Sequence, residues 1–270
     1  MSIESDAILA SLRSSRDSDR LNTLMSIIAS GGENLSDEAI EAIAACLAAD
    51  SKTIRRRAAD ALGAIGRHNS NIVALIRPGL NGASPRIRFG TAYALGTIDG
   101  ALDLDAAPAL CEALGDSDGD VRWAAAELIV RLGPRDPHRV RDDLLELLGT
   151  GNPPARKMAL YCIRDLELTG DEVLCAASSS SRDQDSHVRL AALALLATSF
   201  ANREEAIAQM LERLEADGDA GVRRAAAIAL GASRGGSERV AAALRNASRQ
   251  SADESLARAA RSALDRIGRA

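Results

Sequence analysis

Four acidic residues, Asp116, Asp118, Asp120 and Glu127, have the spacing of a calcium-binding loop. They match the first, third, fifth and twelfth positions of an EF-hand loop, where oxygen ligands surround the ion. The sixth position of such a loop needs glycine for a sharp turn, but this chain has Val121 there. The same carboxylates therefore have two interpretations, a metal site or a structural role at the start of a helix.

The other residue types that commonly carry chemistry are few and scattered. Cys46, Cys111, Cys162 and Cys175 form no Cys-x-x-Cys pair and lie among alanine and leucine, which is typical of reduced, buried cysteines. No arrangement of side chains resembles a catalytic site. We therefore expect a non-enzymatic protein with no catalytic residues, no metal and no cofactor.

The composition favours helices that pack closely through small side chains. Of the 270 residues, 46% are hydrophobic but only 2% are aromatic, so alanine, leucine and isoleucine must form the core.

No apolar run of 18 residues exists, and the first residues are polar and acidic rather than basic and then apolar. We expect a cytoplasmic, monomeric protein that does not enter a membrane. The net charge of −5 argues against a general nucleic-acid binder.

A repeat of 33 to 35 residues runs along the whole chain. It is aligned on an anchor position that holds arginine in seven copies and alanine in the last: Arg20, Arg55, Arg88, Arg122, Arg156, Arg189, Arg223 and Ala257. The residue before the anchor is mostly apolar, as are those three, seven and ten positions after it. These offsets trace one face of an α-helix, so each anchor predicts a helix with a buried face.

A second column of residues decides how the calcium-like loop is interpreted. Four positions before the anchor stand residues that favour a helix N-cap: Ser51, Ser84, Asp118, Asn152, Asp185, Asp219 and Asp253. Asp118 is therefore predicted to cap a helix that already contains Glu127. Equivalent positions carry serine or asparagine where no calcium pattern exists, so we predict an architectural role and no metal site.

Shorter amphipathic segments precede these helices and complete the repeat unit. We predict a single all-α domain, a right-handed α-solenoid of about eight helix pairs and about sixteen helices. Pro78 should bend or end the first helix of the third unit. The expected units are 1–32, 33–67, 68–100, 101–133, 134–168, 169–201, 202–235 and 236–270.

The repeat pattern, Asp-x-x-Val-Arg-x-x-Ala-Ala-x-Ala-Leu-Gly-x-Ile, resembles HEAT repeats, in particular the short HEAT-like repeats of the phycobilisome lyases. The resemblance covers essentially the whole chain, whereas the signatures of tetratricopeptide and ankyrin repeats are absent. It implies that the second helix of each pair lines the concave side. It also implies that the anchor arginines and the capping aspartates form a polar ladder between repeats, so these arginines are structural.

The candidate binding surface follows from the positions that lie off the apolar face. In the family pattern, offsets of one, two, five and nine residues after the anchor point into the concave groove. Four of the five aromatic residues fall there, on three consecutive second helices. An exposed aromatic patch rimmed by charge has the composition of a binding hot spot. The predicted partner-binding residues are Phe89, Tyr93, Trp123, Glu127, Arg131, Lys157, Met158, Tyr161 and Asp165.

Charge gives a second indication about the partner. In repeats two to eight, those positions hold seven basic residues and three acidic ones, although the whole chain is acidic. A basic lining favours a negatively charged partner. The basic residues are Arg56, Arg57, Arg131, Lys157, Arg224, Arg258 and Arg266, and the acidic ones are Asp60, Glu127 and Asp165.

Three functions are compatible with this surface. The first is a scaffold or adaptor that binds a partner protein or an acidic peptide segment in the concave groove. The second, by analogy with the lyases, is a bilin lyase or another protein that handles a tetrapyrrole chromophore. The third is nucleic-acid binding through the basic lining. The HEAT-repeat deoxyhypusine hydroxylases bind iron through His-Glu pairs, but the histidines here precede Asn69, Arg139 and Val188.

Overall fold

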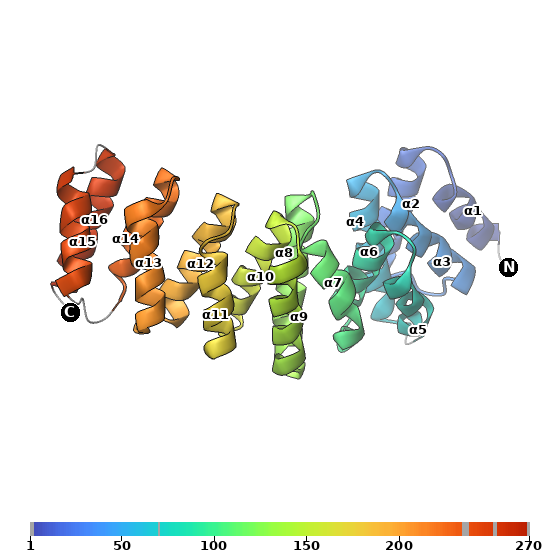
Figure 1. Ribbon diagram of the computed structural model, residues 1–270. Helices are drawn as coiled ribbons and strands as arrows, with labels where there is room; N and C mark the ends of the chain where they lie inside the picture. Colours follow the sequence, from blue (N-terminus) through green and yellow to red (C-terminus); the bar gives the residue numbers. More distant parts are fainter. Residues whose placement is uncertain (1–2, 70, 234–237, 251–252, 269–270) are drawn as a thin grey trace. The chain divides into compact units, whose positions relative to one another are not determined.

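The structure is a computed structural model that describes residues 3–69, 71–233, 238–250 and 253–268. These residues form sixteen α-helices and four short 3-10 helices, with no strand among them (Figure 1). The predicted all-α fold of about sixteen helices is therefore confirmed. The helices group into two compact units, Met1–Pro137 and His138–Ala270, and each is described by itself. The expected boundary between residues 235 and 236 lies outside the described residues.

Unit 1 contains four helix pairs with short 3-10 segments between some of the helices. The first helices are shorter and less regular than the second helices. Its elements are α1 (Ile3–Leu12), α2 (Asp17–Ser30), α3 (Asp37–Ala45), η1 (Cys46–Ala48), α4 (Lys52–Gly66), α5 (Ile72–Ile76), η2 (Arg77–Asn81), α6 (Pro85–Thr97), η3 (Leu104–Ala106), α7 (Ala107–Ala113), α8 (Gly119–Leu132) and η4 (Gly133–Arg135).

Unit 2 contains four further pairs, and its first helices are longer. The last helix of the chain carries the same apolar face although alanine replaces its anchor arginine. The elements are α9 (Pro137–Thr150), α10 (Pro153–Asp165), α11 (Asp171–Ser180), α12 (Ser186–Ser199), α13 (Glu204–Ala216), α14 (Ala220–Leu230), α15 (Glu238–Gln250) and α16 (Glu254–Ile267).

The second helices form the inner layer of each unit. Consecutive second helices, such as α2 and α4 or α12 and α14, pack against one another more extensively than the corresponding first helices do. In a curved stack, the layer whose members approach most closely lies on the inside of the curve. The residues of the second helices that point away from the first helices therefore face the concave side of their own unit.

Polar caps start these second helices where the sequence predicts. Six of the seven predicted caps accept a hydrogen bond from a backbone N–H of the first turn. These N–H groups have no acceptor within the helix, so the cap supplies one. Ser51 is the exception, since its side chain makes no capping bond. The six are Ser84, Asp118, Asn152, Asp185, Asp219 and Asp253.

Small residues allow the helices to approach closely. Alanines three positions after the anchor, including Ala58, Ala125 and Ala192, are fully buried. Large side chains seven positions after the anchor, including Leu62 and Leu196, are fully buried between the helices. Truncating such a side chain to alanine typically costs about 2–5 kcal/mol, so the repeated face holds each unit together.

Proline ends one helix early. The α-helix α5 stops at Ile76 and the chain continues as the 3-10 helix η2, which contains Pro78. Proline has no N–H for the α-helical hydrogen bond and its ring clashes with the preceding turn. The predicted end of the helix at Pro78 is therefore confirmed.

Candidate functional site

Trp123 lies near the start of α8 and is the most exposed large hydrophobic residue among those described, at 57% of its surface. The fully buried Ala125 follows two residues later on a different side of the helix. Trp123 is therefore outside the core of unit 1, as the offset from its anchor Arg122 predicts. Glu127 and Arg131 follow one and two turns later and are also exposed, so this side of α8 presents an aromatic ring followed by two opposite charges.

Phe89 and Tyr93 form an aromatic pair on the neighbouring helix α6. Their ring centroids are 6.0 Å apart and the planes are tilted by 44°, which is a favourable arrangement for aromatic rings. Both side chains are partly exposed, and α6 packs against α8 within unit 1. We call Phe89, Tyr93 and Trp123 the aromatic cluster of unit 1.

The predicted residues of unit 2 lie on α10. Lys157 and Tyr161 are partly exposed one turn apart, and Asp165 follows one turn later. The guanidinium of Arg164 lies 5.0 Å from the centroid of the Tyr161 ring and pairs with Asp165 at 2.8 Å. Sequence reasoning missed Arg164, although its position three residues after Tyr161 places it on the same side of a helix.

Met158 is wrongly placed in the predicted site. Its side chain is 1% exposed, so it belongs to the core of α10 and cannot contact a partner. Gly90 and Ala191 are also buried two residues after their anchors, but Ala124 and Ala225 are partly exposed at this position and Arg57 is exposed. Burial at this position therefore differs between repeats, and the flexible side chain of Met158 fills space in the core.

The predicted patch therefore contains groups from both units. Phe89, Tyr93 and Trp123 belong to unit 1, whereas Lys157 and Tyr161 belong to unit 2. Each group lies on a second helix at the expected offset from its anchor. Their union into one surface stays a prediction.

A groove that sequence reasoning did not single out lies in unit 2 between α14 and α16. It has a volume of about 440 Å³ and its lining contains three arginines and an exposed isoleucine. Its three arginines occupy predicted concave positions, but the sequence alone does not show that they converge on one groove. The lining residues are Arg224, Ile228, Ser255, Arg258, Ala259, Ser262, Ala263 and Arg266.

The anchor arginines are structural residues that hold the loop before their own helix. In repeats two to seven, Nη1 donates to a backbone carbonyl five or six residues earlier, at distances of 2.5–3.0 Å. These bonds satisfy carbonyls that lie outside any helix. The donors are Arg55, Arg88, Arg122, Arg156, Arg189 and Arg223.

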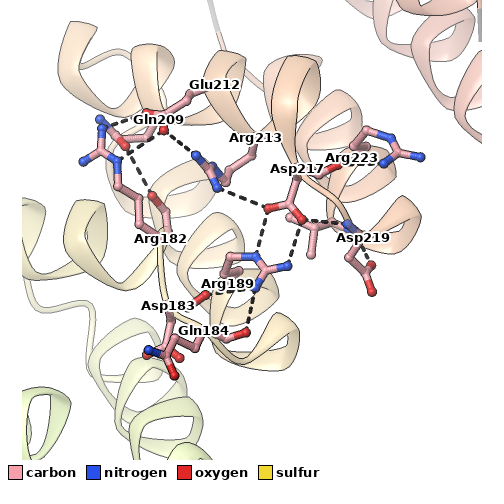
Figure 2. A network of polar contacts seen from close by, with 12 residues as sticks. Arg182, Asp183, Gln184, Arg189, Gln209, Glu212, Arg213, Asp217, Asp219 and Arg223 are labelled. Atoms are coloured by element: carbon pink, nitrogen blue, oxygen red, sulfur yellow. Dashed lines mark hydrogen bonds and ion pairs between the residues drawn. The ribbon is translucent and has the colours of Figure 1, made fainter.

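In unit 2 the ladder continues from one repeat to the next (Figure 2). Arg156 binds Asp183 through two hydrogen bonds of 2.7 and 2.8 Å. Arg189 binds Asp217 in the same way, at 2.9 and 2.8 Å, and Arg213 adds a third contact to Asp217 at 3.3 Å. The side chain of Asp217 is only 1% exposed, so these charges are paired away from water.

The expectation that the capping aspartates pair with the anchor arginines is wrong. Asp185 and Asp219 use their carboxylates to accept backbone N–H groups at the helix start. The arginine partner stands two residues earlier, at Asp183 and Asp217, which also accept the backbone N–H of the cap residue at 2.8 and 2.9 Å. The repeat thus uses two acidic positions, one for the cap and one for the ladder.

Burial alone would raise the pKa of Asp183 and Asp217, because it disfavours the charged form. The hydrogen bonds from Arg156 and Arg189, the backbone N–H groups and the nearby positive charges outweigh burial. The pKa of each carboxyl therefore lies below its ordinary value. Both carboxylates stay ionised at neutral pH.

The three aspartates of the calcium-like loop have protein partners. Asp118 accepts the backbone N–H of Asp120 at 2.9 Å, and Asp116 accepts that of Asp118 at 2.7 Å. Lys52 from α4 pairs with Asp118 at 2.9 Å and with Asp120 at 2.7 Å. The hydrogen bond from Lys52 is the main reason that the pKa of Asp118 lies below its usual value. Within the described residues, no group of three or more potential ligands could hold a metal ion.

A sequence model described as HEAT repeats matches residues 40–129 and 172–265, which together make up more than half of the chain. The chain belongs to the HEAT-repeat family. The resemblance predicted from the anchor and cap columns is thus confirmed. HEAT repeats form helical scaffolds whose long surfaces suit protein interactions.

Solved structures with related architecture share little sequence with this HEAT-repeat chain. Escherichia coli YibA is 17% identical with a TM-score of 0.59, and the match covers 98% of this chain and 92% of YibA. Human deoxyhypusine hydroxylase in complex with glycerol is 20% identical with a TM-score of 0.41, and the match covers 99% of this chain and 96% of the hydroxylase. An engineered protein is 20% identical with a TM-score of 0.47, and the match covers 96% of this chain and 77% of the engineered protein. These similarities concern the fold alone, and the latter two are too loose to support an inference.

No curated protein matches this HEAT-repeat sequence. In the described part of the chain, none of the helices has the length and apolarity needed to span a membrane.

Proposed function

We propose that this HEAT-repeat protein is a non-enzymatic scaffold that binds an acidic segment of a partner protein along the inner faces of its second helices. The observation that carries the proposal is the aromatic cluster of unit 1, in which Trp123 is 57% exposed beside a helix that presents the Phe89–Tyr93 pair. Tryptophan and tyrosine are over-represented among the residues that dominate protein–protein binding energies.

The distribution of exposed hydrophobic residues supports the inner faces as the binding surface. Among the described residues, the large hydrophobic residues that are about half exposed or more are Met25, Trp123 and Ile228. Each lies on a second helix, one or five residues after its anchor position. Exposed apolar surface that is confined to one face is typical of an interaction site.

The charges on the same faces support an acidic partner. Arg56 and Arg131 are exposed on unit 1, and Lys157 is partly exposed on unit 2. Arg57 is partly neutralised, since it pairs with Asp60 at 3.1 Å. A partner with carboxylates would pair with the remaining positive charges, which favours association and fixes orientation more than it adds affinity.

Affinity capture with the wild-type chain and two variants tests the proposal. Trp123→Ala removes the exposed ring and should lose the captured partner, whereas Trp123→Phe keeps an aromatic surface and should retain most of it. Both variants should keep the wild-type melting temperature, because the side chain lies outside the core. Capture that is equal for all three proteins would rule out the aromatic cluster as the binding site.

A titration with duplex DNA separates this proposal from the nucleic-acid alternative. A nucleic-acid-binding surface would give binding that weakens steeply as salt is raised, because counterions are released from the phosphates. We expect no such binding at physiological salt, since the chain carries a net charge of −5. Salt-dependent binding that is lost in Arg56→Gln would favour the alternative.

A further inference from the structure

The groove between α14 and α16 has an unusual concentration of unpaired positive charge. Arg224 contributes one guanidinium from α14, and Arg258 and Arg266 contribute two from α16. No carboxylate is among the lining residues. None of the ion pairs formed by the described residues includes these three arginines, whereas Arg156, Arg189 and other arginines of unit 2 are paired.

An apolar surface lies among these charges. Ile228 follows Arg224 by one turn of α14, lines the groove and is 49% exposed. Ala259 and Ala263 of α16 line the same groove. A ligand that suits this lining must therefore offer negative charge and an aliphatic group together.

The spacing along α16 specifies the ligand further. Arg258, Ser262 and Arg266 are four residues apart, so they lie on successive turns of one side of the helix. The outer two are separated by about 12 Å along the helix axis. In an extended peptide, residues four apart are separated by about 13 Å and point to the same side, as does the residue midway between them. Two carboxylates at this spacing can each meet an arginine while the middle side chain faces the groove.

We infer that this groove binds an extended acidic peptide segment in which an aliphatic residue stands midway between two carboxylates four residues apart. The inference rests on the proposed function for the class of partner, and it assigns the type of segment to a site on unit 2. Nucleic acid fits the lining less well, because no aromatic side chain is present on which a base could stack.

Fluorescence anisotropy with a labelled synthetic peptide tests the inference. The probe contains Glu-Ser-Leu-Ser-Glu between neutral residues and is titrated with the full chain. The double variant Arg258→Gln/Arg266→Gln should weaken binding about tenfold or more, because charged hydrogen bonds at both ends are lost. The matched control is Arg261→Gln, which removes an exposed arginine of the same helix outside the groove and should leave the Kd unchanged.

The apolar half of the site has its own test. Ile228→Ser, or replacement of the probe's leucine by serine, should each weaken binding severalfold, because both remove the same buried contact. A probe with the same composition in the order Glu-Glu-Ser-Ser-Leu should bind less tightly. Equal binding of both probes, or an equal loss in Arg261→Gln, would overturn the inference in favour of unspecific charge attraction. Displacement of the probe by equimolar duplex DNA would overturn the choice of a peptide.

Trp123→Ala separates this inference from the proposed function. It should leave the Kd of the probe unchanged, since Trp123 belongs to unit 1 and the groove to unit 2. If the probe does not bind the wild-type chain but Trp123→Ala still loses its captured partner, the groove inference is wrong and the proposed function stands. If the probe binds through the groove but the captured partner is indifferent to Trp123→Ala, the aromatic cluster is wrong and the groove stands.

Discussion

The anchor arginines are partnered differently in the two units. In unit 2, Arg156 and Arg189 bind backbone carbonyls and also make two-pronged contacts with Asp183 and Asp217, whose side chains are 12% and 1% exposed. In unit 1, Arg88 makes a comparable contact with Glu112, but that side chain is 45% exposed. Among the described residues, Arg55 and Arg122 of unit 1 form carbonyl bonds and no ion pair, as does Arg223 of unit 2.

The difference shows which contact the repeat requires. Carbonyl bonds recur in both units, so holding the loop is the common role of the anchor. For Arg156 and Arg189 the carboxylate stands six residues before the next anchor, whereas Arg88 pairs with Glu112 although Asp116 occupies that position. Unit 2 has Asp183 and Asp217 there, whereas two of the equivalent positions in unit 1 are Ala49 and Gly82. Buried ion pairs should therefore make unit 2 more sensitive to mutation and to acid than unit 1.

The two units also differ in the side chains that their exposed surfaces present. Unit 1 presents aromatic side chains, with Glu127 and Arg131 of opposite charge beside Trp123. Unit 2 presents a groove that contains three arginines and no carboxylate. A partner that uses both would need an apolar portion for one unit and an acidic portion for the other.

Asp217→Ala should have the largest effect on stability. It leaves Arg189 and Arg213, which are 13% and 14% exposed, without their shared carboxylate. Removing one partner of a buried pair typically costs about 3–5 kcal/mol. Chemical denaturation followed by circular dichroism should show this loss, and hydrogen exchange should locate it in unit 2. An exchange pattern that changes equally in both units would contradict the proposed difference.

Acid should destabilise unit 2 through the same carboxylates. The pKa values of Asp183 and Asp217 are lowered in the folded chain, so their stabilisation is fully present above the usual aspartate value of about 3.9. It is lost as the pH falls through the lower folded-state values, where the folded chain takes up the protons. As the pH is lowered through this range, the urea midpoint of unfolding should fall less steeply in Asp183→Asn/Asp217→Asn than in the wild type. Parallel slopes would show that other groups govern the acid response.

Asp118→Ala should cost about 1 kcal/mol of unfolding free energy, because a helix cap is lost. The cost should be the same with calcium and with a chelator, since Asp118 accepts a backbone N–H and pairs with Lys52. Thermal melts under both conditions measure it. Stabilisation of the wild-type chain by calcium would restore the metal interpretation of this loop.

Glu112→Ala should have the smallest effect. The pair with Arg88 is well exposed, so water screens the attraction and the lost side chain costs little. Arg88 would also keep its bond to the carbonyl of Gly82. Denaturation midpoints measured side by side for Glu112→Ala and Asp217→Ala test this prediction. Similar losses of stability in the two variants would contradict the proposed difference between the units.

The repeat architecture was predictable because it depends on periodic residues. The anchor and cap columns located the second helices, and six of seven caps form as expected. The ladder partner was not predictable with the same certainty, because two acidic positions such as Asp217 and Asp219 stand only two residues apart. Only the backbone geometry of the loop decides which one points to the next arginine.

The site was predictable in part, because an offset along a helix defines a direction but not the distance to the neighbouring helix. Trp123 is exposed one residue after its anchor, whereas Met158 is buried two residues after its own. The groove could not be predicted from the sequence, because it depends on how α14 and α16 pack. This packing brings two residues of one repeat beside two of the next, namely Arg224 and Ile228 beside Arg258 and Arg266.

The most direct test of the binding role is the Kd of the captured partner for Trp123→Ala relative to the wild-type chain. An exposed aromatic residue at the centre of an interface should lose about 2 kcal/mol or more of binding free energy when cut to alanine. This corresponds to a Kd about 30-fold weaker, at an unchanged melting temperature. An unchanged Kd in a fully folded variant would contradict the claim that the second-helix face of unit 1 binds the partner.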